Sequence, residues 1–140
     1  MFEEMTATPD LELKLPARAE NVAVIRHALG GLAEALDVDE QALADIKLAV
    51  TEACTNVVIH AYDGDDLGAL EIAASIDDRT LSVVIRDSGR GIVPRPDSPG
   101  LGLGLPLIAT LAESLELGSG TTAHTEVRMT FRLDESDDPA

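Results

Sequence analysis

Aromatic side chains are nearly absent from this 140-residue chain, which has no tryptophan, one tyrosine and two phenylalanines. Apolar residues still make up 45% of the sequence, so the core must be built from Leu, Ile, Val and Ala. A chain of this length can form one domain with a core that needs no disulfide or structural metal. Small aliphatic side chains of this kind suit helices packed against a sheet.

Cysteine is also scarce. Cys54 is alone, which excludes an internal disulfide and a cysteine-rich metal site. Its position in an apolar helical stretch predicts a buried free thiol. The three histidines are spaced so that they fall on different elements, which argues against a histidine metal site.

Basic residues are few: 10 Lys and Arg stand against 26 Asp and Glu, for a net charge of −16. Such a chain repels the phosphate backbone, which argues against direct binding of nucleic acid. The charge can serve solubility or, alternatively, form an acidic docking surface. Acidic residues gather at both ends, which predicts flexible tails at residues 1–10 and 134–140 around a single domain at 11–133.

Long apolar runs are missing as well. The stretch at 96–112, in which Asp97 is the one charged residue, is broken by Gly and Pro, so it cannot span a bilayer. The first residues lack the basic and apolar regions of a signal peptide. We therefore expect a cytoplasmic protein without a membrane partner.

Hydrophobic periodicity predicts the order of the elements. The expected strands are 11–17, 69–77, 79–87 and 126–133, and the second and third form a hairpin. The expected helices are 18–36, a central helix, and 105–115. The central helix begins after Asp37 or Asp39 and carries an apolar stripe from Leu43 to Val57. Gly30 and Gly31 weaken the first helix or mark a bend. The order β-α-α-β-β-loop-α-β predicts an α+β, two-layer sandwich: a mixed, mostly antiparallel sheet with helices on one face.

Three polar residues interrupt the apolar stretch at 46–65 with four-residue spacing. Glu52, Asn56 and His60 fall within a sector of about 80° on one face of a helix. Asn56 could satisfy nearby backbone groups, and His60 could interact with the helix dipole. Alternatively, a carboxylate one turn before an amide suits Mg²⁺-nucleotide chemistry. The amide oxygen can bind the hard cation, and the carboxylate can accept a proton.

The strand at 79–87 ends in a carboxylate. Asp87 has the same parity as Val83 and Ile85, so we expect it on the buried side of the sheet, where a charge needs hydrogen-bond donors. Gly89 and Gly91 follow, and the lack of a Cβ lets a ligand approach the backbone. By itself, "DSGRG" fits a turn after a strand equally well. It lacks the G-x-S-x-G pattern of a hydrolase that would use its serine.

A glycine repeat precedes the last expected helix. Gly100, Gly102 and Gly104 lead into "LPLIATL", and free N–H groups at a helix start bind anions, usually phosphates. The stretch lacks the Lys-Ser/Thr of a P-loop and is not preceded by the strand of a dinucleotide fingerprint. A flexible loop is the alternative interpretation.

Taken in order, "TEACTNVVIHAY", "DSGRGI" and "GLGLGLPLI" resemble the motifs of the GHKL (histidine kinase-like) ATPase superfamily. Within it, the chain resembles the bacterial anti-sigma factor serine-protein kinases of the stress-response and sporulation type, from about Leu11 to Leu133. The resemblance implies a Bergerat-type ATP-binding fold with ATP and Mg²⁺ as cofactors. Sensor histidine kinases share the asparagine and the glycine boxes but differ around them.

The resemblance also implies roles for individual residues. Glu52 would be the general base for a substrate serine, Asn56 would coordinate Mg²⁺, and Asp87 would accept a hydrogen bond from the adenine amine. The other matching positions would surround the nucleotide or bind a partner: Gly89 and Gly91 beside it, Gly100, Gly102, Leu103 and Gly104 at the phosphates and the following helix, Thr125 near the adenine, Arg95 (or Arg90) at the γ-phosphate, and Arg26 on a partner protein.

The implied function is that of an anti-sigma regulatory factor. It would sequester a sigma factor, phosphorylate a serine on an anti-sigma antagonist, and form a homodimer. The segment at 92–99, "IVPRPDSP", is short for an ATP lid. This keeps open an alternative function, a nucleotide-dependent protein-binding switch without significant kinase activity.

Overall fold

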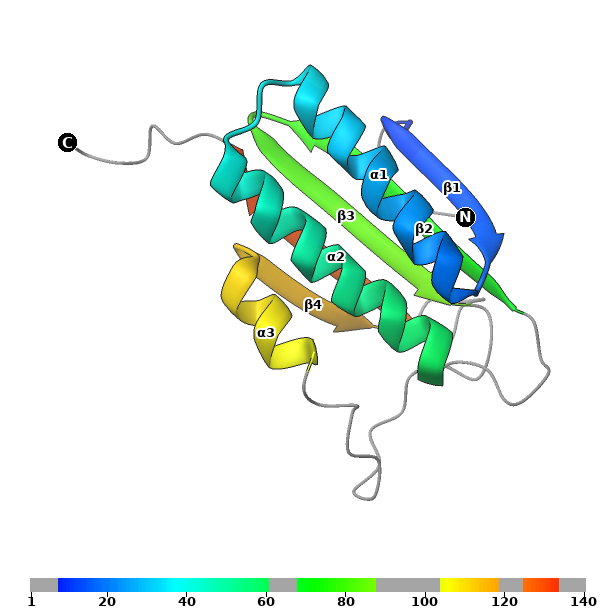
Figure 1. Ribbon diagram of the computed structural model, residues 1–140. Coiled ribbons are helices and arrows are strands. Elements are labelled where there is room, and N and C mark those ends of the chain that lie inside the picture. The colour runs from blue at the N-terminus through cyan, green and yellow to red at the C-terminus, as the bar shows by residue number, and fades with distance from the viewer. Residues whose placement is uncertain (1–7, 61–67, 88–103, 119–124, 134–140) are drawn as a thin grey trace.

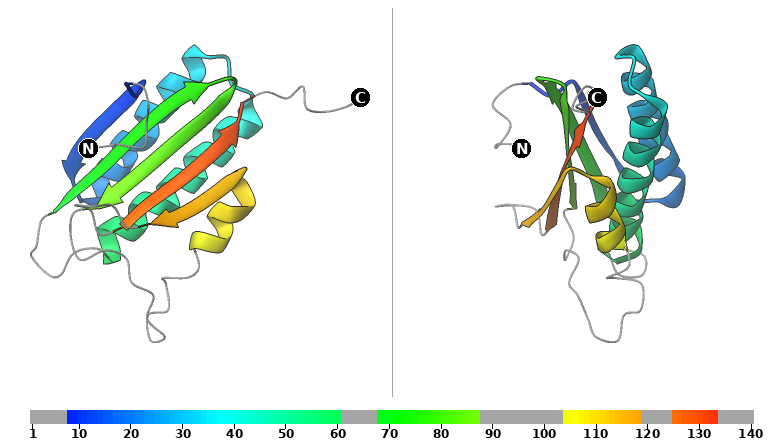
Figure 2. Two further views of the ribbon diagram at one scale, coloured as in Figure 1. Left: turned by 180° about the vertical axis from the view of Figure 1, so that it is seen from behind. Right: turned by 90° about the vertical axis from the view of Figure 1, so that its left-hand side faces the viewer.

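The computed structural model describes residues 8–60, 68–87, 104–118 and 125–133 as two layers, with the helices on one face of a sheet (Figures 1 and 2). The elements in chain order are β1 (Leu11–Pro16), α1 (Ala19–Ala35), α2 (Glu40–His60), β2 (Ala69–Asp77), β3 (Thr80–Asp87), α3 (Gly104–Leu111), β4 (Ser114–Gly118) and β5 (Thr125–Arg132). The predicted α+β sandwich is confirmed.

The sheet has the strand order β1-β2-β3-β5-β4. Each neighbouring pair is antiparallel, so the described sheet is fully antiparallel rather than mixed. β2 and β3 form the expected hairpin through Asp78 and Arg79, which have φ values of 53° and 60°. Positive φ at both central residues is typical of the two-residue turn that matches the twist of a hairpin.

The core lies between the sheet and the helices and is aliphatic, as the composition predicts. Large side chains that are fully buried there come from every layer: Ile25, Leu29, Ile46, Ile72, Ile85, Ile108 and Met129. α1 continues through Gly30 and Gly31 as one helix, so the two glycines do not end it. A Cβ on Gly30 would lie 3.0 Å from Lys47 Cε, so this glycine lets α1 and α2 approach closely.

Both ends of the α1–α2 connection have defined caps. Asp37 adopts φ 56° after α1, and the N–H of Val38 bonds the carbonyl of Ala33, as in a Schellman motif. Asp39 is the residue that caps α2, since its Oδ2 accepts a hydrogen bond from the N–H of Ala42 at 3.2 Å.

One helix prediction was wrong at its end, and one strand was missed. α3 ends at Leu111, and Ser114 and Leu115 belong to β4, which pairs with β5. Leu111 and Leu115 are four residues apart, so they continue the helical spacing and conceal the change of element. Pairing with β5 is a tertiary effect that overrides this local pattern.

The tails predicted at residues 1–10 and 134–140 lie outside the described residues except for residues 8–10. Asp10, at the boundary predicted for the first tail, is bound to β2: its N–H donates to the Ala74 carbonyl, and its Oδ2 accepts from the N–H of Ile76 at 2.8 Å. Among the described helices, none is both long enough and apolar enough to cross a membrane.

Candidate functional site

α2 carries the polar stripe and is covered on two sides. Asn56 is only 6% exposed and Cys54 is fully buried, although the two lie about 160° apart around the helix. Glu52 lies one turn before Asn56 and is half-buried. His60 is the last residue of α2, and its side chain lies outside the described part of the structure. The helix therefore buries the amide and leaves the carboxylate at the border with solvent.

The neighbours of α2 fix the direction in which this stripe points. Lys47 lies on the Cys54 side of the helix and contacts Gly30, so that side faces α1. Asp45 lies on the Asn56 side and lines a cavity of about 280 Å³ together with Leu111 of α3. Figure 1 shows α3 beside α2. By helical spacing from Asp45, Glu52 and Asn56 lie on the side of α2 that faces α3.

α3 runs antiparallel to α2, so its first residue can be placed along α2 (Figure 1). The end of α3 at Leu111 lies beside Asp45, and Gly104 begins the helix seven residues earlier, about 10 Å back. Seven residues forward from Asp45 on α2 is Glu52. Gly104, the first described residue of α3, is therefore level with the Glu52–Asn56 stripe.

Asp87 ends β3 and is fully buried, as its parity predicts. Its register partners are Leu70 of β2 and Thr125 of β5. The structure thus brings two positions of the predicted adenine site, 38 residues apart in sequence, onto neighbouring strands. β3 ends at the same end of the molecule as α2 does (Figure 1).

Several predicted site residues lie outside the described residues. These are Gly89, Gly91, Arg95 (with its alternative Arg90), Gly100, Gly102 and Leu103. Gly104 is placed as the first residue of α3, and the following Leu105 packs against the core. Arg26 is half-buried in the middle of α1, which does not place it with the Glu52–Asn56 stripe.

A buried ion cluster behind Asp87 was not predicted. Arg86 and Glu126, on the sheet face away from the helices, are 5% and 8% exposed. Alternation alone predicts that these side chains point to solvent. The available signal was their opposite charge at positions adjoining Asp87 and Thr125, but using it requires the β3–β5 register.

The donor set fits a magnesium nucleotide. The Asn56 amide oxygen is a hard oxygen donor, and Mg²⁺ binds through few protein oxygens plus phosphates and water. The Glu52 carboxylate on the same helix face is placed to accept a proton. The described residues contain no group of three or more His, Cys, Asp and Glu that could hold a metal ion unaided. Burial raises the pKa of the Cys54 thiol to about 12, so this cysteine is no nucleophile at neutral pH.

Comparison with known proteins identifies the family of the chain. The family model described as "Histidine kinase-like ATPase domain" matches residues 15–131, and the chain belongs to this family. The matched range includes the whole polar stripe, Asp87 and Thr125.

Three similar proteins carry the same name, RsbW, for the protein or for one of its domains. Proteins named "Serine-protein kinase RsbW" from Bacillus thuringiensis and Bacillus anthracis are each 34% identical to this chain, over 76% of either length. A crystal structure of the RsbU and RsbW domains of a Mycobacterium tuberculosis protein superposes with a TM-score of 0.71 and 25% identity. That match covers 90% of this chain but 32% of the larger one.

Proposed function

We propose that the chain is an ATP-dependent protein serine kinase that phosphorylates an anti-sigma antagonist and sequesters a sigma factor. One observation carries this proposal: Glu52 and Asn56 lie together on the side of α2 that faces α3, level with the first residue of α3. The relatives named serine-protein kinase support the same activity. The sigma factor and the antagonist are proposed from the sequence motifs.

In this proposal, each group at the site has one task. The Asp87 carboxylate accepts a hydrogen bond from the adenine amine, near Thr125 on the neighbouring strand. The N–H groups at Gly104 and the glycines before it bind the phosphates. Asn56 would hold Mg²⁺, which supplies charge neutralisation at the phosphates.

Glu52 acts on the protein substrate. Its carboxylate accepts the proton of the substrate serine hydroxyl, whose oxygen forms a bond to the γ-phosphorus. The bond between that phosphorus and the bridging oxygen breaks, and the electron pair leaves with ADP. A half-buried position suits this role, because the carboxylate must meet both the nucleotide and a protein that arrives from solvent.

Transfer of labelled γ-phosphate to the cognate antagonist tests the kinase activity. We expect Glu52→Ala to reduce transfer about 100-fold or more while it leaves ATP binding intact, since a general base contributes about 10²–10⁴-fold. Asn56→Ala should lose Mg²⁺-dependent ATP binding and transfer together. The matched control is Gln41→Ala, which removes an exposed amide from the same helix, about 22 Å along the helix axis from Asn56.

The same variants separate the kinase from the alternative, a nucleotide-dependent binding switch. If Glu52→Ala keeps full regulation of its partner while Asn56→Ala loses it, the function is binding rather than transfer. Absence of transfer by the wild-type chain to its antagonist contradicts the kinase proposal. We further propose that the chain is a cytoplasmic homodimer and that Arg26 contacts the regulated protein partner. Light scattering of the purified chain tests the homodimer, and binding of that partner by Arg26→Ala tests the role of Arg26.

A further inference from the structure

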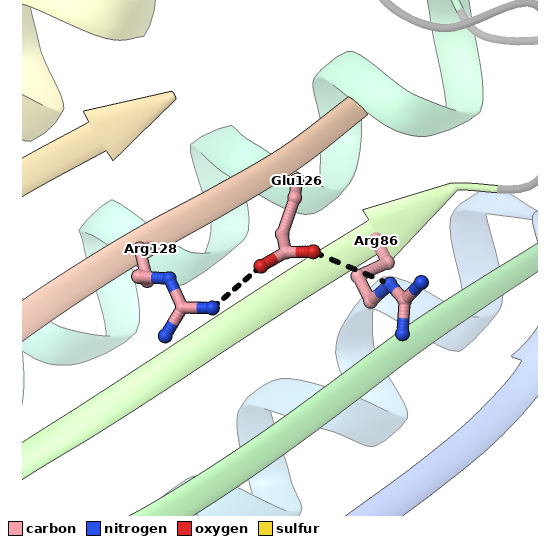
Figure 3. A network of polar contacts seen from close by, with 3 residues as sticks. All are labelled: Arg86, Glu126 and Arg128. Carbon is pink, nitrogen blue, oxygen red and sulfur yellow. Dashed lines mark hydrogen bonds and ion pairs between the residues drawn. The ribbon is translucent and has the colours of Figure 1, made fainter. Parts of the chain in front are cut away.

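Three charged residues form a cluster on the sheet face away from the helices (Figure 3). Arg86 of β3 and Glu126 of β5 are register partners, and Arg86 Nε lies 3.6 Å from Glu126 Oε1. Arg128, two residues along β5, donates from Nη2 to Glu126 Oε2 at 2.6 Å. Glu126 is thus held between two guanidinium groups that come from different strands.

The cluster is buried deeply enough that the loss of one of its charges should destabilise this part of the sheet. The side chains of Arg86, Glu126 and Arg128 are 6%, 10% and 29% exposed. Charges removed from water need compensation, so removal of one partner of such a cluster is costly. The Arg132–Glu113 pair near the other end of β5 is also 3.6 Å long, but both of its side chains are about half exposed. A solvated pair of that kind contributes little.

The position of the cluster connects it to the nucleotide site. Arg86 precedes Asp87, and Glu126 follows Thr125, so the two pairs are neighbouring rungs of the β3–β5 ladder about 3.3 Å apart. Successive side chains point to opposite faces, which puts the cluster on the outer face and Asp87 on the face toward the helices. Within the described residues, the Asp87–Thr125 rung has one neighbouring rung between these strands, the Arg86–Glu126 rung.

We propose that Glu126 is a positioning residue for nucleotide recognition: through Arg86 it fixes the β3–β5 pairing next to Asp87 and so holds the Asp87 carboxylate where it selects adenine. This inference rests on the proposed ATP site. Adenine presents an amine donor where guanine presents a carbonyl, so a fixed carboxylate accepts one and repels the other. Loss of the Glu126 carboxylate leaves the Arg86 charge without this partner and lets the strands shift beside Asp87, so the discrimination between the two bases falls.

The test is the ratio of the dissociation constants for GTP and ATP, measured by calorimetry with Mg²⁺. We expect Glu126→Ala to weaken ATP binding about tenfold, the loss that one misaligned charged hydrogen bond produces, with GTP binding nearly unchanged. The ratio therefore falls about tenfold. Glu126→Gln keeps the size of the side chain but removes the charge that faces Arg86 at 3.6 Å, so it should lower the ratio in the same direction as Glu126→Ala. Glu113→Ala, the control on the solvated pair, should leave it at the wild-type value.

The outcomes distinguish this inference from the proposed function. A wild-type chain that binds no ATP contradicts both. A wild-type chain that selects ATP, with a folded Glu126→Ala variant that keeps the same ratio, overturns the positioning role alone. If Glu126→Ala does not fold, Glu126→Gln, which keeps the volume and removes the charge, is measured in the same way; an unchanged ratio in that folded variant overturns the inference.

Discussion

Alkaline pH should destabilise this protein through Cys54. The size of the effect tests whether α2 is oriented with Cys54 buried in the core. The thiol is fully buried, and burial raises its pKa from 9.0 to about 12. Because the pKa is higher in the folded state, the unfolded chain loses the thiol proton first as pH rises. The stability contributed by the neutral thiol is complete below pH 9 and is lost between pH 9 and about 12.

The size of the effect follows from the same shift. Ionisation of the thiol in the unfolded chain costs about 1.4 kcal/mol of stability at pH 10 and approaches about 4 kcal/mol near pH 12. Cys54→Ala removes this loss. The difference in unfolding free energy between the wild type and Cys54→Ala should therefore shift by about 1.4 kcal/mol between pH 8 and pH 10, in favour of the variant.

Urea unfolding followed by circular dichroism at the two pH values measures this difference. Other groups that titrate in this range are present in both chains and cancel. Native Cys54 should also resist maleimide far longer than it does in urea. Equal pH dependence of the two chains, or rapid labelling of the native thiol, would refute the burial of Cys54. It would also refute the orientation of α2 that directs Asn56 toward α3.

Two further predictions concern helix stability, each measured by urea unfolding. Gly31→Ala should stabilise the chain by about 0.5–1 kcal/mol, because a Cβ there meets nothing within 4 Å and alanine is the better helix former. Gly30→Ala is its matched control and should gain less, since its Cβ would displace the end of Lys47; an equal gain would contradict the close approach of α1 and α2. Asp39→Ala should cost about 1 kcal/mol by removing the cap on Ala42, and an unchanged midpoint would show that the cap contributes nothing.

Local patterns in the sequence were sufficient for most elements. The alternation at 69–77 and 79–87 predicted the hairpin within one residue, and the parity of Asp87 predicted its burial. These predictions succeeded because side-chain direction in a strand depends only on the backbone. β4 was missed, because its five residues form a strand only through their pairing with β5.

The arrangement of the site required the structure. No local pattern reveals that Thr125 lies opposite Asp87, or that the start of α3 is level with Glu52. The burial of Arg86 and Glu126 was also beyond the sequence, because strand alternation alone directs both side chains to the outer face of the sheet. In each case the missing information is the placement of one element beside another. Such placement depends on residues far apart in the chain.

Calorimetric titration of the wild-type chain with ATP, with and without Mg²⁺, tests the central claim most directly. The proposed site predicts saturable binding that is tighter with Mg²⁺, because Asn56 and the phosphates share the ion. It also predicts that the Mg²⁺ dependence disappears in Asn56→Ala and persists in Gln41→Ala. No binding of ATP under either condition would contradict the account.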